Sequence, residues 1–354
     1  MTMKTNDCDA GVRLRLPAEW EPCRAILVAW PHKDTDWAYM LDEVERCYDN
    51  MAVAISRFAR LIVVAADAAY VRERLVCAGV SEAALTVVEI KTNDTWTRDY
   101  GPISTVLEQA DSRTVVLNDF CFNGWGLKFA ADRDNLVTRR LVFDDVLGHD
   151  SRYRNELSFV LEGGSIDSDG NGTLLTTSRC LLSPNRNGAL TRRGINQYLK
   201  KALGMTKIHW LEHGALEGDD TDSHIDTLAR LAPHDTIIYT GCENPADSHY
   251  DELAGMRAEL RSLRTADGRP YNMVELPLPT PIYDEEGERL PATYANYLVV
   301  NGGVLVPAYG QPKTDTLAAL LIASVYPDRE VVQVDCRALI RQHGSLHCAT
   351  MQIL

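Results

Sequence analysis

The feature that most restricts the fold of this 354-residue chain is the regular alternation of short apolar runs with segments of helical spacing. Residues 25–30 (AILVAW) form an apolar run of the length expected for a buried strand. Between residues 37 and 58, apolar side chains recur at helical spacing, and Asp34 or Thr35 is the expected N-cap. The run at 61–65 predicts a second strand. Strands and helices that alternate in this way indicate an α/β architecture.

The same alternation continues over the rest of the chain. A helix is predicted at 67–78, ended by Gly79, and a strand follows at 85–90. No change of composition and no linker rich in Pro, Gly or Ser divides the sequence, so we expect one domain over residues 1–354. Further strands are predicted at 114–117, 157–161, 173–177, 206–211, 236–240, 297–300, 304–307 and 331–334, and further helices at 132–147, 191–203, 250–263 and 314–325.

Several predicted strands end in a short polar or glycine-containing segment, and these segments recur roughly every 50 to 70 residues, as structural repeats do. They share no sequence identity, so the repeat signal is weak by itself. A true repeat would bring all of them to one end of a central set of strands. The segments are 92–99, 162–164, 219–226, 301–303 and 344–348.

Composition excludes some classes of function. The formal net charge is -14 and no basic stripe is present, which argues against nucleic-acid binding. An acidic surface favours a cationic ligand, although many soluble proteins are equally acidic. No apolar run approaches the ~20 residues that span a bilayer, and no signal peptide is recognisable, so we expect no membrane partner. The nine cysteines are scattered without a CxxC pair, which indicates a reducing, cytoplasmic location and no structural zinc site.

Near the C-terminus, residues 343–350 (HGSLHCAT) place a cysteine behind a Gly-Ser pair and next to His347. Cys348 could be a nucleophile held on a tight turn. It could equally be one buried thiol in a terminal strand, because free cysteine is among the most buried residue types.

The acidic segment 219–226 (DDTDSHID) allows three interpretations. His224 and Asp226 are two residues apart, so on an extended segment they face the same side and could bind a cation and move a proton. The segment could instead be an acidic loop that caps the following element. Its carboxylates and imidazole could also bind a metal ion.

Two further segments carry candidate groups. In 96–102 (WTRDYGP), Asp99 could bind a planar cation through paired hydrogen bonds beside the ring of Trp96, or it could form a local ion pair with Arg98 at a turn. Glu162, followed by two glycines, could orient a histidine or could be a solvated turn residue. The loop 122–126 (FNGWG) is either a hairpin turn or a pocket lid.

The combined set contains a Cys, a His, two Asp and a Glu, each just after a predicted strand. No phosphate-binding glycine loop, HExxH motif or dinucleotide fingerprint is present. These residue types support covalent chemistry at a thiol without a cofactor.

These motifs, in this order, resemble the agmatine deiminase and bacterial-type peptidylarginine deiminase family of the guanidino-modifying (pentein) superfamily. The resemblance runs nearly from end to end. It covers PAEWEP (17–22), AWPH (29–32), NDTWTRDYGP (93–102), FNGWG (122–126), EGG (162–164), HID (224–226), NGG (301–303) and HCAT (347–350).

The resemblance implies a five-bladed α/β propeller with pseudo-fivefold ββαβ modules and a narrow central site. It implies that Cys348 is the nucleophile, His224 the general acid and base, Asp99 and Asp226 the guanidinium-binding carboxylates, and Glu162 the residue that orients His224. It implies no metal or organic cofactor. Expected substrate-binding residues are Trp96, Asp94, Trp125, Gly163 and Asn301.

The implied reaction is deimination of a small cationic guanidinium substrate, with agmatine first and peptidylarginine or free arginine as alternatives. His343 stands where the family has a glycine and Met351 where it has a polar residue, and these differences concern the substrate more than the reaction. Amidino transfer, a metal-dependent hydrolase built on 219–226, and a polyamine-binding protein without activity remain open. A homodimer also remains open.

Overall fold

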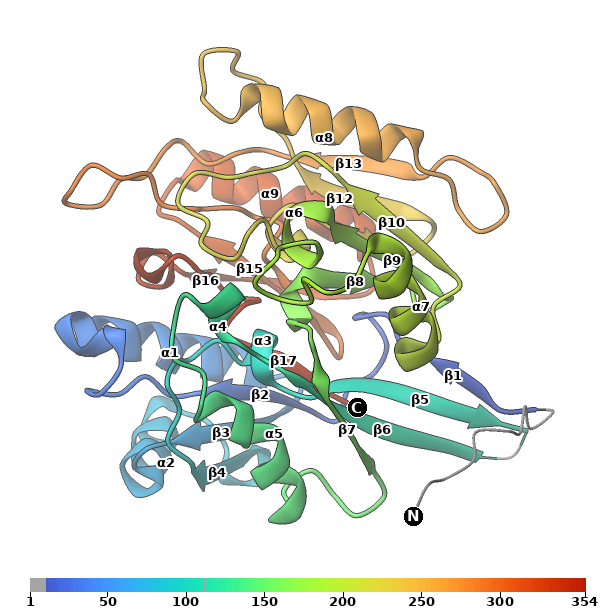
Figure 1. The fold of residues 1–354 in the computed structure, drawn as a ribbon. Coiled ribbons are helices and arrows are strands. Elements are labelled where there is room, and N and C mark those ends of the chain that lie inside the picture. The colour runs from blue at the N-terminus through green and yellow to red at the C-terminus, as the bar shows by residue number, and fades with distance from the viewer. Residues whose placement is uncertain (1–10, 111) are drawn as a thin grey trace.

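The computed structural model describes residues 11–110 and 112–354, and the strands in these ranges form five separate sheets (Figure 1). Each sheet contains an antiparallel strand pair with a parallel strand beside it. In four of the sheets the chain runs strand, strand, helix, strand. The α/β architecture predicted from the alternation of elements is therefore confirmed, and its sheets are mixed.

The first sheet joins the two ends of the described chain. Strand β17 (Met351–Ile353) pairs antiparallel with β2 (Ala25–Ala29), so the C-terminal segment lies in the middle of the molecule (Figure 1). Strands β3 (Arg60–Ala65) and β4 (Leu85–Glu89) follow in parallel. This pairing ties down a terminus that would otherwise fray.

Helices α1 (Leu41–Ser56) and α2 (Ala68–Ala78) connect these strands. The predicted helix over 37–58 begins as a separate 3-10 turn (Asp36–Met40) and continues as α1. Asp67 caps α2 by accepting a hydrogen bond from the Tyr70 amide, and Gly79 ends it with a φ of 108°. Both ends of α2 therefore follow from capping residues visible in the sequence.

The other four sheets follow one after another along the chain. Within each of them one helix connects the antiparallel strand pair to the parallel strand, and each helix is close to its predicted position: α5 (Asp134–Phe143), α7 (Arg192–Leu203), α8 (Tyr250–Ser262) and α9 (Pro312–Val325). The sheets are β1 (Arg13–Arg15), β5 (Ile103–Gln109), β6 (Ser112–Cys121) and β7 (Arg152–Val160); β8 (Ile166–Ser168), β9 (Thr173–Thr177) and β10 (Lys207–Leu211); β11 (Ala229–Ala232), β12 (Thr236–Thr240) and β13 (Asn272–Leu276); and β14 (Leu298–Val300), β15 (Gly303–Ala308) and β16 (Glu330–Asp335).

Short helical turns connect strands and carry many of the residues of the candidate site. They are α3 (Thr97–Tyr100), α4 (Gly124–Leu127), α6 (Ser178–Leu181) and the 3-10 turns Gly163–Ser165, Ile225–Thr227 and Leu339–Gln342. Most of the buried apolar side chains form one large cluster, and a smaller cluster lies around β11, β12 and α8. None of the described helices has the length and apolar character needed to cross a membrane.

Candidate active site

Cys348 lies in the turn just before β17 and is 6 % exposed. Nδ2 of Asn296 donates a hydrogen bond to its Sγ at 3.2 Å, and Oδ2 of Asp226 lies 3.7 Å from the same sulfur. Oδ1 of Asn296 accepts hydrogen bonds from the backbone amides of His347 (2.9 Å) and Cys348 (3.3 Å). Asn296 therefore positions both the sulfur and the backbone that carries it.

The surroundings of the thiol favour its neutral form. Burial raises the pKa of Cys348 well above its usual value, and the carboxylates of Asp226 and Asp99 raise it further. A cation placed between these carboxylates and the sulfur would have the opposite effect, because it would stabilise the thiolate. A positively charged ligand at this place would therefore favour the nucleophilic form of Cys348.

Asp99, on the short helix α3, is held by two donors. Its Oδ2 accepts a hydrogen bond from the indole Nε1 of Trp125 at 2.9 Å, and its Oδ1 accepts one from the amide of Gly164 at 3.0 Å. Burial raises the pKa of Asp99, and nearby His224 opposes this rise. The local ion pair between Arg98 and Asp99 considered from the sequence is wrong.

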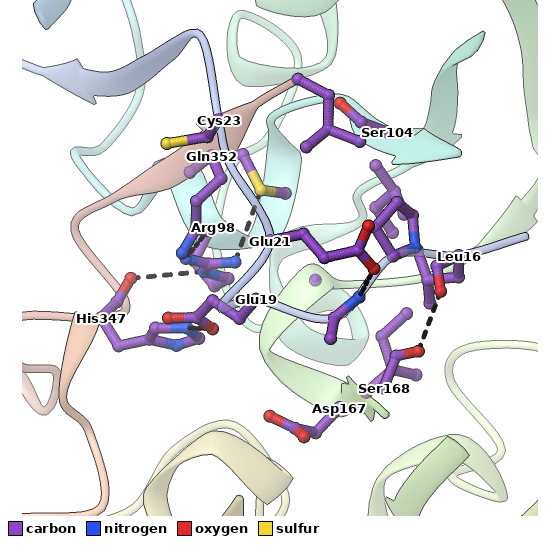
Figure 2. A pocket seen from close by; sticks show the side chains of 17 residues that line it. Leu16, Glu19, Glu21, Cys23, Arg98, Ser104, Asp167, Ser168, His347 and Gln352 are labelled. Carbon is purple, nitrogen blue, oxygen red and sulfur yellow. Dashed lines mark hydrogen bonds and ion pairs between the residues drawn. The ribbon is translucent and has the colours of Figure 1, made fainter. Parts of the chain in front are cut away.

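Arg98 instead extends away from Asp99 toward the C-terminal strand. It donates to the carbonyl of His347 (3.4 Å) and to Oε1 of Gln352 (2.5 Å), and it lines a separate cavity of about 100 Å³ with Glu19 (Figure 2). Its positive charge is therefore not available beside Cys348.

His224 lies fully buried, with Nδ1 3.6 Å from Oδ1 of Asp99. Within the described residues neither ring nitrogen has a hydrogen-bond partner. Burial alone would lower the pKa of His224, but Asp99, Cys180 and Glu162 outweigh it and hold the pKa well above the usual value. These groups therefore favour the protonated imidazole, which is the form that can deliver a proton.

Glu162 is close to His224 but is anchored by a residue that the sequence did not indicate. Both of its carboxylate oxygens lie within 3.0 Å of Nε of Arg186, and both side chains are fully buried. Arg186 also bonds to Asp222 and to the carbonyl of Thr221. Glu162 is thus a fixed negative charge beside His224.

Gly164, rather than the predicted Gly163, faces the acidic groups. A Cβ on Gly164 would lie 2.7 Å from Nδ1 of His224 and 2.9 Å from Oδ1 of Asp99. A Cβ on Gly163 would instead meet the carbonyl of Arg98 and the side chain of Met351. The turn at 163–165 thus presents its second glycine to His224 and Asp99, and contact of Gly163 with a ligand stays a prediction.

The acidic segment 219–226 is mainly a loop stabilised by its own side chains. Asp219 accepts hydrogen bonds from Thr221 and from the amide of Ser223, and Asp222 pairs with Arg186 (2.6 Å) and Lys128 (2.8 Å). These carboxylates are occupied by protein donors. The loop interpretation is therefore favoured over a metal site there.

Within the described residues, one group of side chains has the spacing of metal ligands: Glu162, Cys180 and His224, whose donor atoms lie within 4.8 Å of one another. The guanidinium of Arg186 bonds to Glu162. Its positive charge opposes a second cation at this place, so the group fits a metal ion poorly.

A narrow cavity of about 20 Å³ reaches Cys348, which is room for about one water molecule. The ring of Trp96 forms part of its wall, packs against Gly344 and lies 5.7 Å from the ring of Trp37. Burial raises the pKa of Asp94, at the same cavity, to about 7. The lining residues are Asp36, Asp94, Trp96, Asp99, Trp125, Phe129, Asp220, Thr221, Gln342, His343, Gly344 and Cys348.

The loop 122–126 is a wall of this cavity and not a hairpin turn. Trp125 has a φ of 54° and lies between Gly124 and Gly126, which also have positive φ values. Its ring packs edge-on against Phe122 at 4.8 Å and against Phe129 at 5.5 Å. This uncommon backbone conformation is what directs the indole nitrogen toward Asp99.

Comparison with known proteins agrees with this arrangement. The family model of the Porphyromonas-type peptidyl-arginine deiminases matches residues 15–353. The chain belongs to this family. The resemblance inferred from the motifs is therefore confirmed over almost the whole sequence.

Relatives within and around this family include an agmatine deiminase of Pseudomonas aeruginosa (strain LESB58). It is 33 % identical over 360 residues, which cover 96 % of this chain and 95 % of the relative. A cysteine-to-serine variant of the C. jejuni agmatine deiminase, with substrate bound, has 35 % identity, a TM-score of 0.88 and 98 % coverage of both chains. A Porphyromonas gingivalis protein provisionally named an arginine deiminase has 50 % identity and a TM-score of 0.89, with coverage of 96 % of this chain and 98 % of the other.

In this family member, Cys348, His224, Asp99, Asp226 and Glu162 lie in one buried group, with Trp125 bonded to Asp99 and with Trp96 and Asp94 at the cavity. The predicted Asn301 lies elsewhere. Its amide bonds to both backbone groups of Cys23, at 2.9 and 2.7 Å, so it holds the N-terminal segment and not a ligand.

Sequence reasoning missed Asn296, whose side chain hydrogen-bonds to the sulfur of Cys348. The sequence had not indicated any residue for this contact. Asn296 precedes strand β14, whereas the candidate residues were chosen because they follow the ends of predicted strands. The available signal was an asparagine in an apolar stretch (Tyr294–Tyr297), where a buried amide needs partners.

Proposed function

We propose that this protein hydrolyses agmatine to N-carbamoylputrescine and ammonia through a covalent thiol intermediate. The observation that carries the proposal is the position of Cys348 Sγ beside Asp226, with Asp99 and His224 completing the same buried group. Agmatine deiminases of similar length and fold support the same reaction.

The first half of the reaction needs a guanidinium fixed opposite the sulfur. Asp99 and Asp226 accept hydrogen bonds from its N–H groups, and the bound positive charge lowers the cost of forming the thiolate of Cys348, whose proton leaves to solvent. The thiolate attacks the guanidinium carbon. The carbon–nitrogen bond to one amino group then breaks, and His224 donates its proton so that ammonia departs.

The second half hydrolyses the adduct. His224, now neutral, takes a proton from a water molecule that attacks the same carbon. The carbon–sulfur bond breaks as the new hydroxyl group gives up its proton to the departing sulfur, so the thiol is regenerated and a ureido group remains on the substrate. Each step uses side chains of this chain, and the atoms of one water molecule balance the ammonia that is released.

The cavity lining supports agmatine as the substrate. Agmatine carries a second positive charge at its amino end, and Asp36, Asp94 and Asp220 line the cavity in addition to Asp99. Among its described lining residues there is no lysine or arginine to bind the α-carboxylate of free arginine. Arg98 points to the other cavity, and Arg24 pairs with Asp150.

A substrate panel tests this proposal. Purified protein is incubated with agmatine, 1-butylguanidine, free arginine and an arginyl peptide, and ammonia and ureido product are measured. We expect agmatine to have the highest kcat/KM. Turnover of the arginyl peptide or arginine in preference to agmatine would refute the assignment of substrate, and a product carrying an added amine would indicate amidino transfer.

The nucleophile is tested by Cys348→Ala, with the exposed Cys77→Ala as a matched control. We expect the first variant to lose turnover and the second to retain it, with both folded by circular dichroism. A Cys348→Ala protein that still releases ammonia would contradict the mechanism.

We also propose that the five sheets stand around this site as the blades of a five-bladed pentein propeller in a single deiminase domain. The repeated order of strand, strand, helix and strand supports this architecture, and the site draws residues from segments between 36 and 348. A cytoplasmic location and a homodimer stay predictions.

A further inference from the structure

The ring of His347 lies between two carboxylates that come from distant parts of the chain. Its Nδ1 is 2.7 Å from Oδ2 of Asp226, and its Nε2 is 2.8 Å from Oε2 of Glu19. All three side chains are at most 13 % exposed. Figure 2 shows Glu19 and His347 facing each other beside Arg98.

These contacts define the charges of the group. A carboxylate accepts hydrogen bonds and an imidazole nitrogen donates only when it carries a proton, so two such bonds require both ring nitrogens to be protonated. Glu19 is fixed in its charged form, because Arg230 and His347 hold its pKa well below the usual value despite burial. Its other oxygen accepts a hydrogen bond from the amide of Val299 at 2.8 Å.

Because of His347, the two carboxylate oxygens of Asp226 differ in their hydrogen bonding. Oδ2 is bonded to the ring, whereas Oδ1 is buried and has no hydrogen-bond partner among the described residues. A buried carboxylate oxygen without a partner is costly, and a donor brought by a ligand would satisfy it. Oδ1 is therefore the atom of Asp226 that is left open for an incoming N–H group.

The two substrate-facing carboxylates differ as a consequence. Burial favours the neutral form of both, but the hydrogen bond and charge of His347 hold the pKa of Asp226 below its usual value. Asp99 has no such imidazolium bonded to it, and its pKa is raised. The hydrogen bond from His347 therefore favours the charged form of Asp226 more strongly than the surroundings of Asp99 favour its charged form.

We propose that Glu19 and His347 are positioning residues that keep Asp226 charged and oriented, with Oδ1 free, before the guanidinium arrives. This role rests on the proposed function, because it assumes that Asp226 binds a guanidinium. The proposal assigns a positioning role to the PAEWEP segment (17–22), which lies far from Cys348 in the sequence. It assigns the same role to the histidine that directly precedes Cys348.

Other charged and titratable groups also face these residues, and the experiment must separate their effects. Arg230 is the most important, since it bonds to Glu19 and also to Oδ2 of Asp167 at 2.6 Å. The groups near Asp226 are His224, Cys348, Asp99, Arg98 and Arg230, and those near Glu19 are Arg230, Arg98, Asp167, Cys23, Tyr297 and Tyr326.

Three variants with one matched control test the proposal. His347→Asn keeps a neutral donor near the place of Nδ1, and His347→Gln keeps one near the place of Nε2. Glu19→Gln removes the negative charge that lies next to Nε2 of His347. The control, Asp167→Asn, also removes one carboxylate charge from buried Arg230 but does not touch His347.

The kinetic readout is the pH profile of kcat/KM for agmatine. Without His347, burial drives the pKa of Asp226 upward, so the acid limb should move to higher pH, and KM at neutral pH should rise at least about tenfold. His347→Asn should lose less than His347→Gln, because it retains the bond to Asp226. Glu19→Gln should move the limb in the same direction and Asp167→Asn should not.

A second readout does not depend on turnover. In protein with 15N-labelled histidine, both ring nitrogens of His347 should show imidazolium shifts at pH 7 in the wild type and in Asp167→Asn. In Glu19→Gln one nitrogen should take the shift of an unprotonated imidazole nitrogen. If agmatine is not a substrate but these shifts are observed, the proposed function fails and the charge arrangement stands.

Either of two results would overturn the inference. One is a neutral His347 ring in the wild-type protein. The other is equal displacement of the acid limb in Glu19→Gln and Asp167→Asn, which would show that loss of the Arg230 ion pairs, and not the link through His347, is responsible.

Discussion

The indole nitrogen of Trp125 donates a hydrogen bond of 2.9 Å to Oδ2 of Asp99. The two residues are 26 positions apart, and the backbone of Trp125 adopts a left-handed conformation to make this contact. Trp125 therefore does not only supply apolar surface to the cavity. It also holds Asp99, one of the two carboxylates that face the Cys348 sulfur.

Replacement of Trp125 by Phe removes this donor and leaves a buried carboxylate oxygen without a partner. Such a loss costs about 1–3 kcal/mol, so we expect kcat/KM for agmatine to fall roughly tenfold or more. Trp96→Phe is the matched control, because no hydrogen bond of the Trp96 indole to Asp99 exists in the described structure and the ring wall is retained. Equal losses in the two variants would mean that Trp125 acts only by packing.

Replacement of Asn296 by Ala should lower kcat more than it raises KM. The side chain bonds to the Cys348 sulfur and to the amides of residues 347 and 348, so its loss releases the nucleophile from its position. We expect at least a roughly tenfold fall in kcat, measured with saturating agmatine. Asn301→Ala should lower the melting temperature without this effect on kcat, since Asn301 bonds only to the backbone of Cys23 among the described residues.

The affinity for the amino end of agmatine should weaken as the pH falls. Burial raises the pKa of Asp94 to about 7 and that of Asp220 to about 6, so both carboxyls at the cavity become neutral below these values. KM for agmatine should therefore rise as the pH is lowered through this range. 1-Butylguanidine has the same length without the ammonium group, and its KM should change less. Parallel profiles for the two compounds would count against an amine-binding role of these carboxyls.

Replacement of Arg186 by Met should destabilise the fold strongly. It leaves Glu162 buried without its partner, and breaking a buried ion pair costs about 3–5 kcal/mol. The free energy of unfolding in urea measures this change. Arg192→Met removes an exposed pair with Glu212, so the expected cost is below about 1 kcal/mol. A loss near zero at Arg186 would show that Glu162 is held by other contacts.

Much of the secondary structure was predictable because it is encoded locally. Buried strands such as β2 and β3 appear as apolar runs, and α2 begins and ends at a capping aspartate and a glycine. The strands that were missed include short ones at sheet edges: β1 and β17 have three residues each and β11 has four. Such segments become strands through pairing with partners elsewhere in the chain, which no local pattern reveals.

The sequence by itself determined the order of strands and helices, the family, and the presence of Cys348, His224, Asp99, Asp226 and Glu162 near strand ends. These are properties of local spacing and of residue type. They do not specify which side chains touch.

Tertiary structure alone decided how the site is assembled. It turned Gly164 and not Gly163 toward the carboxylates, placed Asn296 against the sulfur, and brought Glu19 to His347 across 328 positions of sequence. The physical reason is that buried polar groups must find partners wherever the packed chain brings them. The pairing of charges therefore emerges only when all the sheets are in place.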